Sequence, residues 1–178
     1  MNIIDQIIFN YSNNKSLYIG EKVTMSEHMI QTAMLAENTN CSSDLVCSSL
    51  LHDYGHFILE NPDDLVNKNK DGKHEDVGCT FLEKYFIEDV LGPIKYHVKA
   101  KKYLAREENY YRLLSKASKI SLKLQGGIMN NEEAEKFERN KFFENSIKLR
   151  KFDEVAKKSG LKIKSINEYK NLLISKLI

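Results

Sequence analysis

Apolar residues recur at intervals of three and four positions along most of the chain, and this spacing is typical of amphipathic α-helices. No stretch alternates apolar and polar residues as a half-buried strand would, and no internal repeat is evident. Only two prolines and eight glycines interrupt the helical pattern. The pattern therefore predicts an all-α fold.

Capping signals predict where several helices begin. Thr24 with Glu27 forms a capping-box pattern that opens a helix running to about Asn38, and Ser165 with Glu168 forms a second one. Ser43 with Asp44 opens a helix that ends near His52, and the remaining helices are expected over about residues 74–86, from Pro93 onward, and over 110–125, 132–139, 142–159 and 166–177. Gly126, Gly127 and Gly160 are expected to stop helices, and the polar stretch 59–73 is expected to be a long loop.

The composition indicates an ordinary soluble protein. A chain of 178 residues with 42% hydrophobic content can build one sizeable core, so a single domain over residues 1–178 is expected. The 27 basic and 25 acidic residues give a net charge of +2 with mixed signs, which offers no argument for nucleic-acid or membrane binding. The lysines of the C-terminal third are expected on a solvated helical face.

The cysteines and the N-terminus bear on the cellular compartment. Three cysteines without a CxxC pair favour reduced thiols in a cytosolic protein. The N-terminus lacks a signal-peptide pattern, and no apolar run approaches the roughly 20 residues needed to span a bilayer. A cytoplasmic location is therefore expected.

The candidate chemistry lies in the histidines, all five of which fall between positions 28 and 97, and in the motif "HDYGH". These are His28, His52, His56, His74 and His97. A single histidine on an apolar helix face is more often explained by packing or capping, but five with a neighbouring aspartate favour a metal site. Imidazole and carboxylate groups without thiolates suit iron, manganese or another divalent ion better than structural zinc. Asp53 can bridge two cations with its two oxygens, so His52-Asp53 is a natural nucleus for a dinuclear centre.

The order of these residues resembles the signature of the HD-domain superfamily. His28, His52-Asp53 and Asp153 occupy the places of that signature, and His74 with His97 matches the extended pattern that supplies a second metal. Several longer segments are similar to the HD-domain mixed-valent di-iron oxygenases that cleave organophosphonates: "YIGE" (18–21), "EHMIQTA" (27–33), "HVKAKKYL" (97–104), "LSKASKISLKLQGGIM" (114–129) and "KLRKFDEVAK" (148–157). The myo-inositol oxygenases are related in mechanism and share the ligand set but not these segments.

The resemblance implies a single HD-domain helical bundle with two iron ions in the Fe2+/Fe3+ state as cofactors. One iron would be held by His28, His52 and Asp153, and the other by His74 and His97. Asp53 would bridge the two ions. Open positions on each ion would then be available to the substrate and to dioxygen.

Two basic residues lie at helical spacing from these ligands. Lys101 follows His97 by four positions, and Arg150 precedes Asp153 by three, so each should share a helix face with a ligand. Lysine and arginine beside two cations suit a dianion such as a phosphonate. The alternative is that both are surface residues whose apolar stems cover the core.

The resemblance assigns further substrate contacts. It implies that Ser118 joins Lys101 and Arg150 in holding the phosphonate, and that Tyr18 occupies an open iron position until substrate displaces it. It also implies that Glu21 pairs with a substrate ammonium. His56 is expected to contact the substrate near its hydroxyl, and its competing role is to close the helix end.

The implied activity is oxidative carbon–phosphorus cleavage of a 1-hydroxyalkylphosphonate by O2, giving phosphate and a carboxylic acid. The amine-bearing substrates 1-hydroxy-2-aminoethylphosphonate and its N-trimethyl analogue would give glycine and glycine betaine. The alternatives are a metal-dependent HD-domain phosphohydrolase or phosphodiesterase with the same ligands, and a non-catalytic sensing or adaptor module. The small-molecule phosphonate and O2 are the expected partners, and the oligomeric state is left open.

Overall fold

The computed structural model describes residues 1–18, 21–59 and 72–178. Its helices are α1 (Ile3–Asn13), α2 (Met25–Asn38), α3 (Ser43–Leu51), the 3-10 helix η1 (Tyr54–Phe57), α5 (His74–Leu82), α6 (Glu88–Leu104), α7 (Glu108–Leu113), α8 (Lys116–Leu124), α9 (Asn131–Glu138), α10 (Phe143–Val155), the 3-10 helix η2 (Ile166–Tyr169) and α11 (Lys170–Ile174). Within the described ranges the backbone forms no β-sheet, and its β-bridges are isolated pairs, Leu17 with Thr24 and Phe86 with Leu177. The predicted all-α fold is confirmed.

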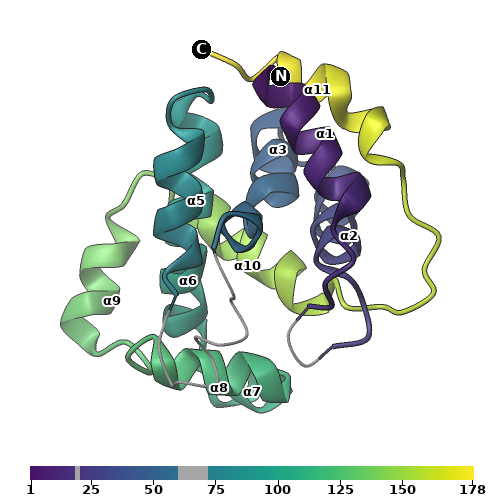
Figure 1. The fold of residues 1–178 in the computed structure, drawn as a ribbon. Coiled ribbons are helices and arrows are strands. Elements are labelled where there is room, and N and C mark those ends of the chain that lie inside the picture. The colour runs from purple at the N-terminus through teal and green to yellow at the C-terminus, as the bar shows by residue number, and fades with distance from the viewer. Residues whose placement is uncertain (19–20, 60–71) are drawn as a thin grey trace.

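Four helices form the centre of the molecule, and the others surround them (Figure 1). Helix α10 packs against α6, α2 and α3, while α2 packs against α3 and α3 against α6. Helices α1 and α11 lie side by side, so the two ends of the chain meet at one side of the molecule. Helices α7, α8 and α9 lie on the side away from these ends. One large apolar cluster extends from Ile4 in α1 to Leu173 in α11 and ties the two ends of the chain to the centre.

The predicted capping signals are largely present. Thr24 and Glu27 form a reciprocal capping box, with Glu27 N donating to Thr24 Oγ1 over 3.1 Å and Thr24 N donating to a Glu27 carboxylate oxygen over 2.7 Å. Ser165 and Glu168 form the same device at the start of η2. The cap of α3 is Ser42 and not Ser43, because the Ser42 hydroxyl accepts from Leu45 N and Ser43 is already helical.

Several predicted boundaries are wrong. The helix expected to begin at Pro93 begins at Glu88, with Pro93 inside it, because acidic residues favour the first turn and apolar Val90 is buried against the core. The helix expected over 110–125 is split, since Ser115 caps a new helix, α8, by accepting from Ser118 N. The last expected helix consists of η2 followed by the short α11.

Other segments also depart from the expectations. Helix α10 ends at Val155 and not near residue 159, while Gly160, five positions later, has the positive φ of 74° that glycine adopts easily. Helix α5 ends at Leu82, four residues before the expected end. The expected loop 59–73 falls mostly outside the described residues. None of the described helices combines the length and apolar character that crossing a membrane requires. A single domain over the whole chain stays a prediction.

Candidate metal centre

The HDYGH motif forms the junction between α3 and α5. His52 caps the C-terminus of α3, Asp53 follows, and Gly55 lies in η1. The backbone of η1 lies directly against α5, because a Cβ atom on Gly55 would come within 2.0 Å of the carbonyl oxygen of His74. Gly78 lies on the other side of this contact, and a Cβ atom on it would lie 3.0 Å from Gly55 N. These two glycines therefore let α5 approach closely enough to set His74 beside Asp53.

Three predicted ligands from distant parts of the chain meet in a first group. His28 from α2, His52 from the end of α3 and Asp153 from α10 each offer a ligand atom within 4.8 Å of the others, and all three are buried. His28 Nε2 lies 3.2 Å from His52 Nε2 and 3.3 Å from Asp153 Oδ1. This buried oxygen of Asp153 has no hydrogen-bond partner among the residues that the structure describes.

The other three predicted ligands meet in a second group that consists of Asp53, His74 and His97. His74 Nε2 lies 3.1 Å from His97 Nε2, and Asp53 Oδ1 lies 3.2 Å and 3.5 Å from these two nitrogens. Asp53 Oδ2 faces the first group, at 3.6 Å from His28 Nε2 and 3.5 Å from His52 Nε2. Each oxygen of the Asp53 carboxylate therefore faces a different group.

Backbone carbonyls fix the tautomers of three of these histidines. The Nδ1 atoms of His28, His52 and His97 donate to the carbonyl oxygens of Ala156, Ser49 and Ile94 over 2.9, 2.9 and 2.6 Å. A carbonyl oxygen only accepts, so Nδ1 carries the proton and the Nε2 of a neutral ring carries a lone pair. Lone pairs and carboxylate oxygens that converge within a few ångströms repel one another unless a cation lies among them. The donor set therefore fits a pair of metal ions.

Burial and charge favour the ligating forms of His52, His97 and both carboxylates, whereas the hydrogen bond and charge of Asp53 outweigh burial at His74 and raise its pKa. Burial, reinforced by the charge of His74, lowers the pKa of His97 to about 3, and burial also lowers the pKa of His52. Burial alone would raise the pKa of Asp53, but the attraction of His52 and the hydrogen bond from His74 hold it well below its usual range. The pKa of Asp153 is held low against burial chiefly by Arg150. Neutral imidazoles and ionised carboxylates are the forms that bind metals.

Arg150 and Ser118 lie beside the first group of ligands, and Lys101 lies on α6 together with His97 of the second group. Arg150 contacts Asp153, and its Nη2 donates to Ser118 Oγ over 3.3 Å. Lys101 Nζ donates to Ser121 Oγ over 2.8 Å. The exposed fractions of Lys101 and Arg150 are 5% and 3%, so the alternative that they are surface residues is wrong. Burial, followed by the charge of Arg150, lowers the pKa of Lys101 to about 7.

Glu154 and Lys157 complete this cluster and were missed from the sequence. Glu154 accepts from Ser115 N and Ser118 Oγ, both over 3.0 Å, and also pairs with Arg150. Lys157 lies 3.4 Å from Glu154 Oε1, and only 9% of its side chain is exposed, so the expectation of a solvated lysine face is wrong here. The signal was the spacing in "KLRKFDEVAK", where Arg150 and Glu154 are four apart and Glu154 and Lys157 three apart.

Tyr18, Glu21 and His56 approach the centre from two other directions. The Tyr18 ring stacks on the His28 ring with centroids 4.1 Å apart, and burial raises the pKa of its hydroxyl. Glu21 Oε1 lies 3.8 Å from Lys157 Nζ. His56 stacks on His74 at 4.4 Å, and its buried Nδ1 makes no hydrogen bond within the described residues. Burial, with His74 nearby, lowers the pKa of His56 to about 3, so this ring is neutral.

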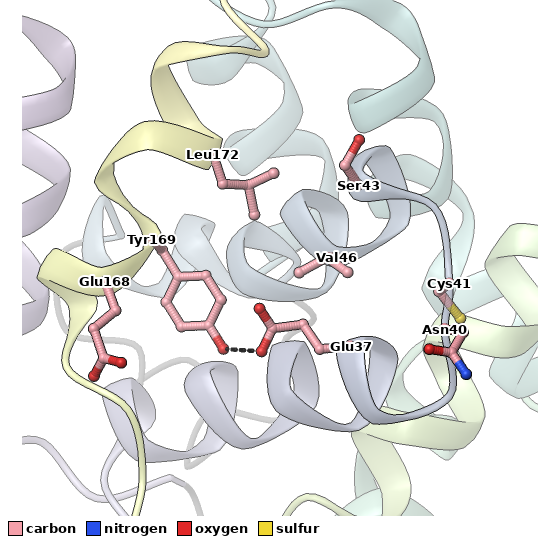
Figure 2. A pocket seen from close by; sticks show the side chains of 8 residues that line it. All are labelled: Glu37, Asn40, Cys41, Ser43, Val46, Glu168, Tyr169 and Leu172. Atoms are coloured by element: carbon pink, nitrogen blue, oxygen red, sulfur yellow. Dashed lines mark hydrogen bonds between the residues drawn. The ribbon is translucent and has the colours of Figure 1, made fainter.

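A separate hollow of about 480 Å³ lies between the C-terminal end of α2, the start of α3 and η2. Figure 2 shows its lining, which consists of Glu37, Asn40, Cys41, Ser43, Val46, Glu168, Tyr169 and Leu172. The Tyr169 hydroxyl donates to Glu37 across the hollow over 3.0 Å. None of the predicted site residues is among the described residues that line it, and His28 lies near the opposite end of α2. All three cysteines of the chain are free thiols.

Comparison with known proteins shows which family and which enzymes this chain resembles. The family model described as HD domain matches residues 25–134, a span that includes both groups of ligands except Asp153. The chain is 41% identical to [1-hydroxy-2-(trimethylamino)ethyl]phosphonate dioxygenase (glycine-betaine-forming) of Leisingera caerulea, over 81% of this chain and 74% of that protein. It is 38% identical to hydroxymethylphosphonate dioxygenase of Gimesia maris, over 85% and 77%. An uncharacterised protein of Acanthamoeba polyphaga mimivirus is 37% identical over 99% of this chain and 85% of its own length.

Proposed function

Because this chain belongs to the HD-domain family, we propose that it is an iron-dependent oxygenase that uses O2 to break the carbon–phosphorus bond of a 1-hydroxyalkylphosphonate. The observation that carries the proposal is that a shared carboxylate, Asp53, faces both groups of ligands while a buried cationic cluster adjoins one of them. The two relatives named above as phosphonate dioxygenases support this chemistry.

The metal-binding roles follow from the two groups. His28, His52 and Asp153 would hold one iron, His74 and His97 the other, and Asp53 would bridge them. Bound iron supplies the one-electron and dioxygen chemistry that amino-acid side chains lack. The side chains fix the positions of the ions through hydrogen bonds such as the one from His28 Nδ1 to the carbonyl oxygen of Ala156.

The anion-binding roles belong to Lys101, Ser118 and Arg150. Arg150 is already oriented by Asp153 and by the Tyr110 hydroxyl, which accepts from its Nε over 3.0 Å. A guanidinium held on several sides presents its remaining N–H group at a fixed angle. Within the described part of the chain, Lys101 donates one ammonium hydrogen to Ser121, so two of the three are available to a substrate. These groups would place the phosphonate so that the carbinol carbon faces the metal pair.

Tyr18, Glu21 and His56 would complete the pocket. Tyr18 covers the His28 ring and excludes water from that side until substrate displaces it. The neutral ring of His56 has a nitrogen, Nδ1, without a partner among the described residues, and it can accept a hydrogen bond from the substrate hydroxyl. Glu21 would face the substituent on the neighbouring carbon.

The overall reaction balances without an external electron donor. The carbinol carbon loses its bonds to hydrogen and phosphorus and becomes a carboxylic acid, while phosphorus leaves as phosphate. One O2 molecule accounts for both added oxygen atoms and accepts all four electrons. With an amino or trimethylammonio substituent the acid would be glycine or glycine betaine.

The test is to load the protein with iron, add a panel of 1-hydroxyphosphonates, and measure released phosphate with and without oxygen. Phosphate should appear only with oxygen and only from substrates that carry the hydroxyl. Hydrolysis of phosphate esters by protein loaded with manganese or magnesium, without any need for oxygen, would instead support the alternative, a phosphohydrolase. A cytoplasmic location stays a prediction.

A further inference from the structure

Lys157 joins two parts of the proposed site that are otherwise separate. Its ammonium lies 3.2 Å from Ser118 Oγ and 3.4 Å from Ser115 Oγ, at the start of α8. On its other side it lies 3.8 Å from Glu21 Oε1 and 5.6 Å from the centre of the Tyr18 ring. The lysine therefore stands between the groups proposed for the phosphonate and those proposed for the substituent.

Lys157 contacts Glu21 in addition to Glu154 Oε1, which lies 3.4 Å from its Nζ, whereas the contacts described for the other buried cations of the cluster are with other groups. Lys101 donates to Ser121, and Arg150 contacts Asp153 and Glu154. Among the described residues, Lys157 is the cation that pairs with Glu21, and the side chains of the pair are only 9% and 18% exposed. Partial burial strengthens such a pair relative to one in bulk water.

We propose that Lys157 determines specificity, because its ammonium occupies the place beside Glu21 and the Tyr18 ring that a cationic substituent on the substrate would take. This inference rests on the proposed function. A substrate ammonium has to displace Lys157 from Glu21 and meets a like charge as it does so. An uncharged substituent leaves the pair from Lys157 to Glu21 intact. The lysine thus weakens binding of a cationic substituent relative to an uncharged one, whichever of the two substrates binds more tightly.

The experiment compares two ligands that differ in one group. The first, 1-hydroxy-2-aminoethylphosphonate, carries an ammonium where the second, 1-hydroxypropylphosphonate, carries a methyl group. Dissociation constants are measured by calorimetry on iron-loaded protein without oxygen, so that no turnover occurs. The variants are Lys157→Met, Glu21→Gln and the double variant. Lys158→Met is the matched control, because it removes the same charge from an exposed neighbour.

Lys157→Met should improve binding of the ammonium ligand relative to the methyl ligand by at least about fivefold, the size of a favourable exposed ion pair. In the Glu21→Gln background the same change should have a smaller effect, and Lys158→Met should leave the ratio unchanged. Equal effects of Lys157→Met on both ligands would mean that Lys157 serves only the phosphonate, which overturns the inference. Lys157→Gln, with iron content and melting temperature recorded, replaces Lys157→Met if that variant does not fold.

The two proposals fail in different ways. If the wild-type protein binds both ligands but releases no phosphate under oxygen, the oxygenase function is wrong and the ratio still tests Lys157. If the wild-type protein binds neither ligand, both the function and the role of Lys157 are overturned.

Discussion

Asp53 Oδ1 lies 3.2 Å from His74 Nε2, and the opposite oxygen of the same carboxylate faces the first group of ligands. Among the described residues, Asp53 is the only one of the six proposed ligands that reaches both groups. Loss of the Asp53 carboxylate should therefore affect metal binding at both groups, whereas loss of any other ligand should affect mainly one.

Asp53→Ala should abolish iron binding at both positions, whereas Asp153→Ala should remove iron mainly from the first group. Metal content per chain after anaerobic reconstitution measures this difference. Asp89→Ala, at an exposed aspartate of α6, is the control and should bind as much iron as the wild type. Two irons per chain in Asp53→Ala would contradict the bridge.

Gly55→Ala should destabilise the protein by about 1–3 kcal/mol and lower the iron content, because the added methyl group meets the His74 carbonyl oxygen at 2.0 Å. Helix α5 would have to move, and His74 with it. Gly78→Ala should have a smaller effect, since its methyl group meets Gly55 N at 3.0 Å. Thermal unfolding and metal analysis test both variants, and an unchanged melting temperature in Gly55→Ala would contradict the close backbone contact.

Lys101 should give the activity an alkaline limb. Burial and Arg150 lower its pKa to about 7, against the opposing charges of Asp153, Asp53 and Glu75. The lysine is cationic below this pH and loses its charge, and with it the attraction for a phosphonate, as the pH rises. Bound metal cations would lower the pKa of Lys101 further, as Arg150 does.

To test Lys101, kcat/KM is measured over a range of pH for the wild type and for Lys101→Arg, whose side chain stays charged. Dividing the first value by the second cancels the effect of substrate ionisation, which is the same for both proteins. This ratio should fall by about fivefold between pH 7 and 8, as for one ionising group. A ratio independent of pH would show that Lys101 is not the group that titrates.

Glu154→Gln should raise KM for the phosphonate by about tenfold and leave the iron content unchanged. The amide keeps the shape of the side chain but weakens the charge-assisted contacts to Arg150 and the bond from Ser118 Oγ. Glu135→Gln, at an exposed position of α9, is the control. A loss of iron or a fall in kcat alone would mean that Glu154 supports the metal groups rather than the anion pocket.

The histidine cluster was predictable because few residue types perform its chemistry. Six imidazole and carboxylate side chains in a fixed order have no common explanation other than a metal site, and the structure brings all six together. Helix starts were predictable where a capping box was present, as at Thr24 with Glu27.

The charged cluster was harder to foresee, since lysine and glutamate usually lie on solvated faces. The spacing in "KLRKFDEVAK" places Glu154 and Lys157 near Arg150, but it does not show that they are buried. Their burial depends on the start of α8, where Ser115 and Ser118 contact both side chains. Boundaries were also misplaced where tertiary packing outweighs local preference, as at Pro93, which lies inside a helix instead of opening one.

The hydrogen bond from His28 to Ala156 joins positions 128 residues apart in the sequence. During synthesis on the ribosome, the first group of ligands cannot close until α10 has emerged, whereas every residue of the second group lies before position 98. The nascent chain can therefore acquire the surroundings of one ion well before those of the other. Assembly of the proposed metal centre and completion of the polypeptide are then linked in time, and a chain truncated before α10 would keep the second group complete but lack Asp153 of the first.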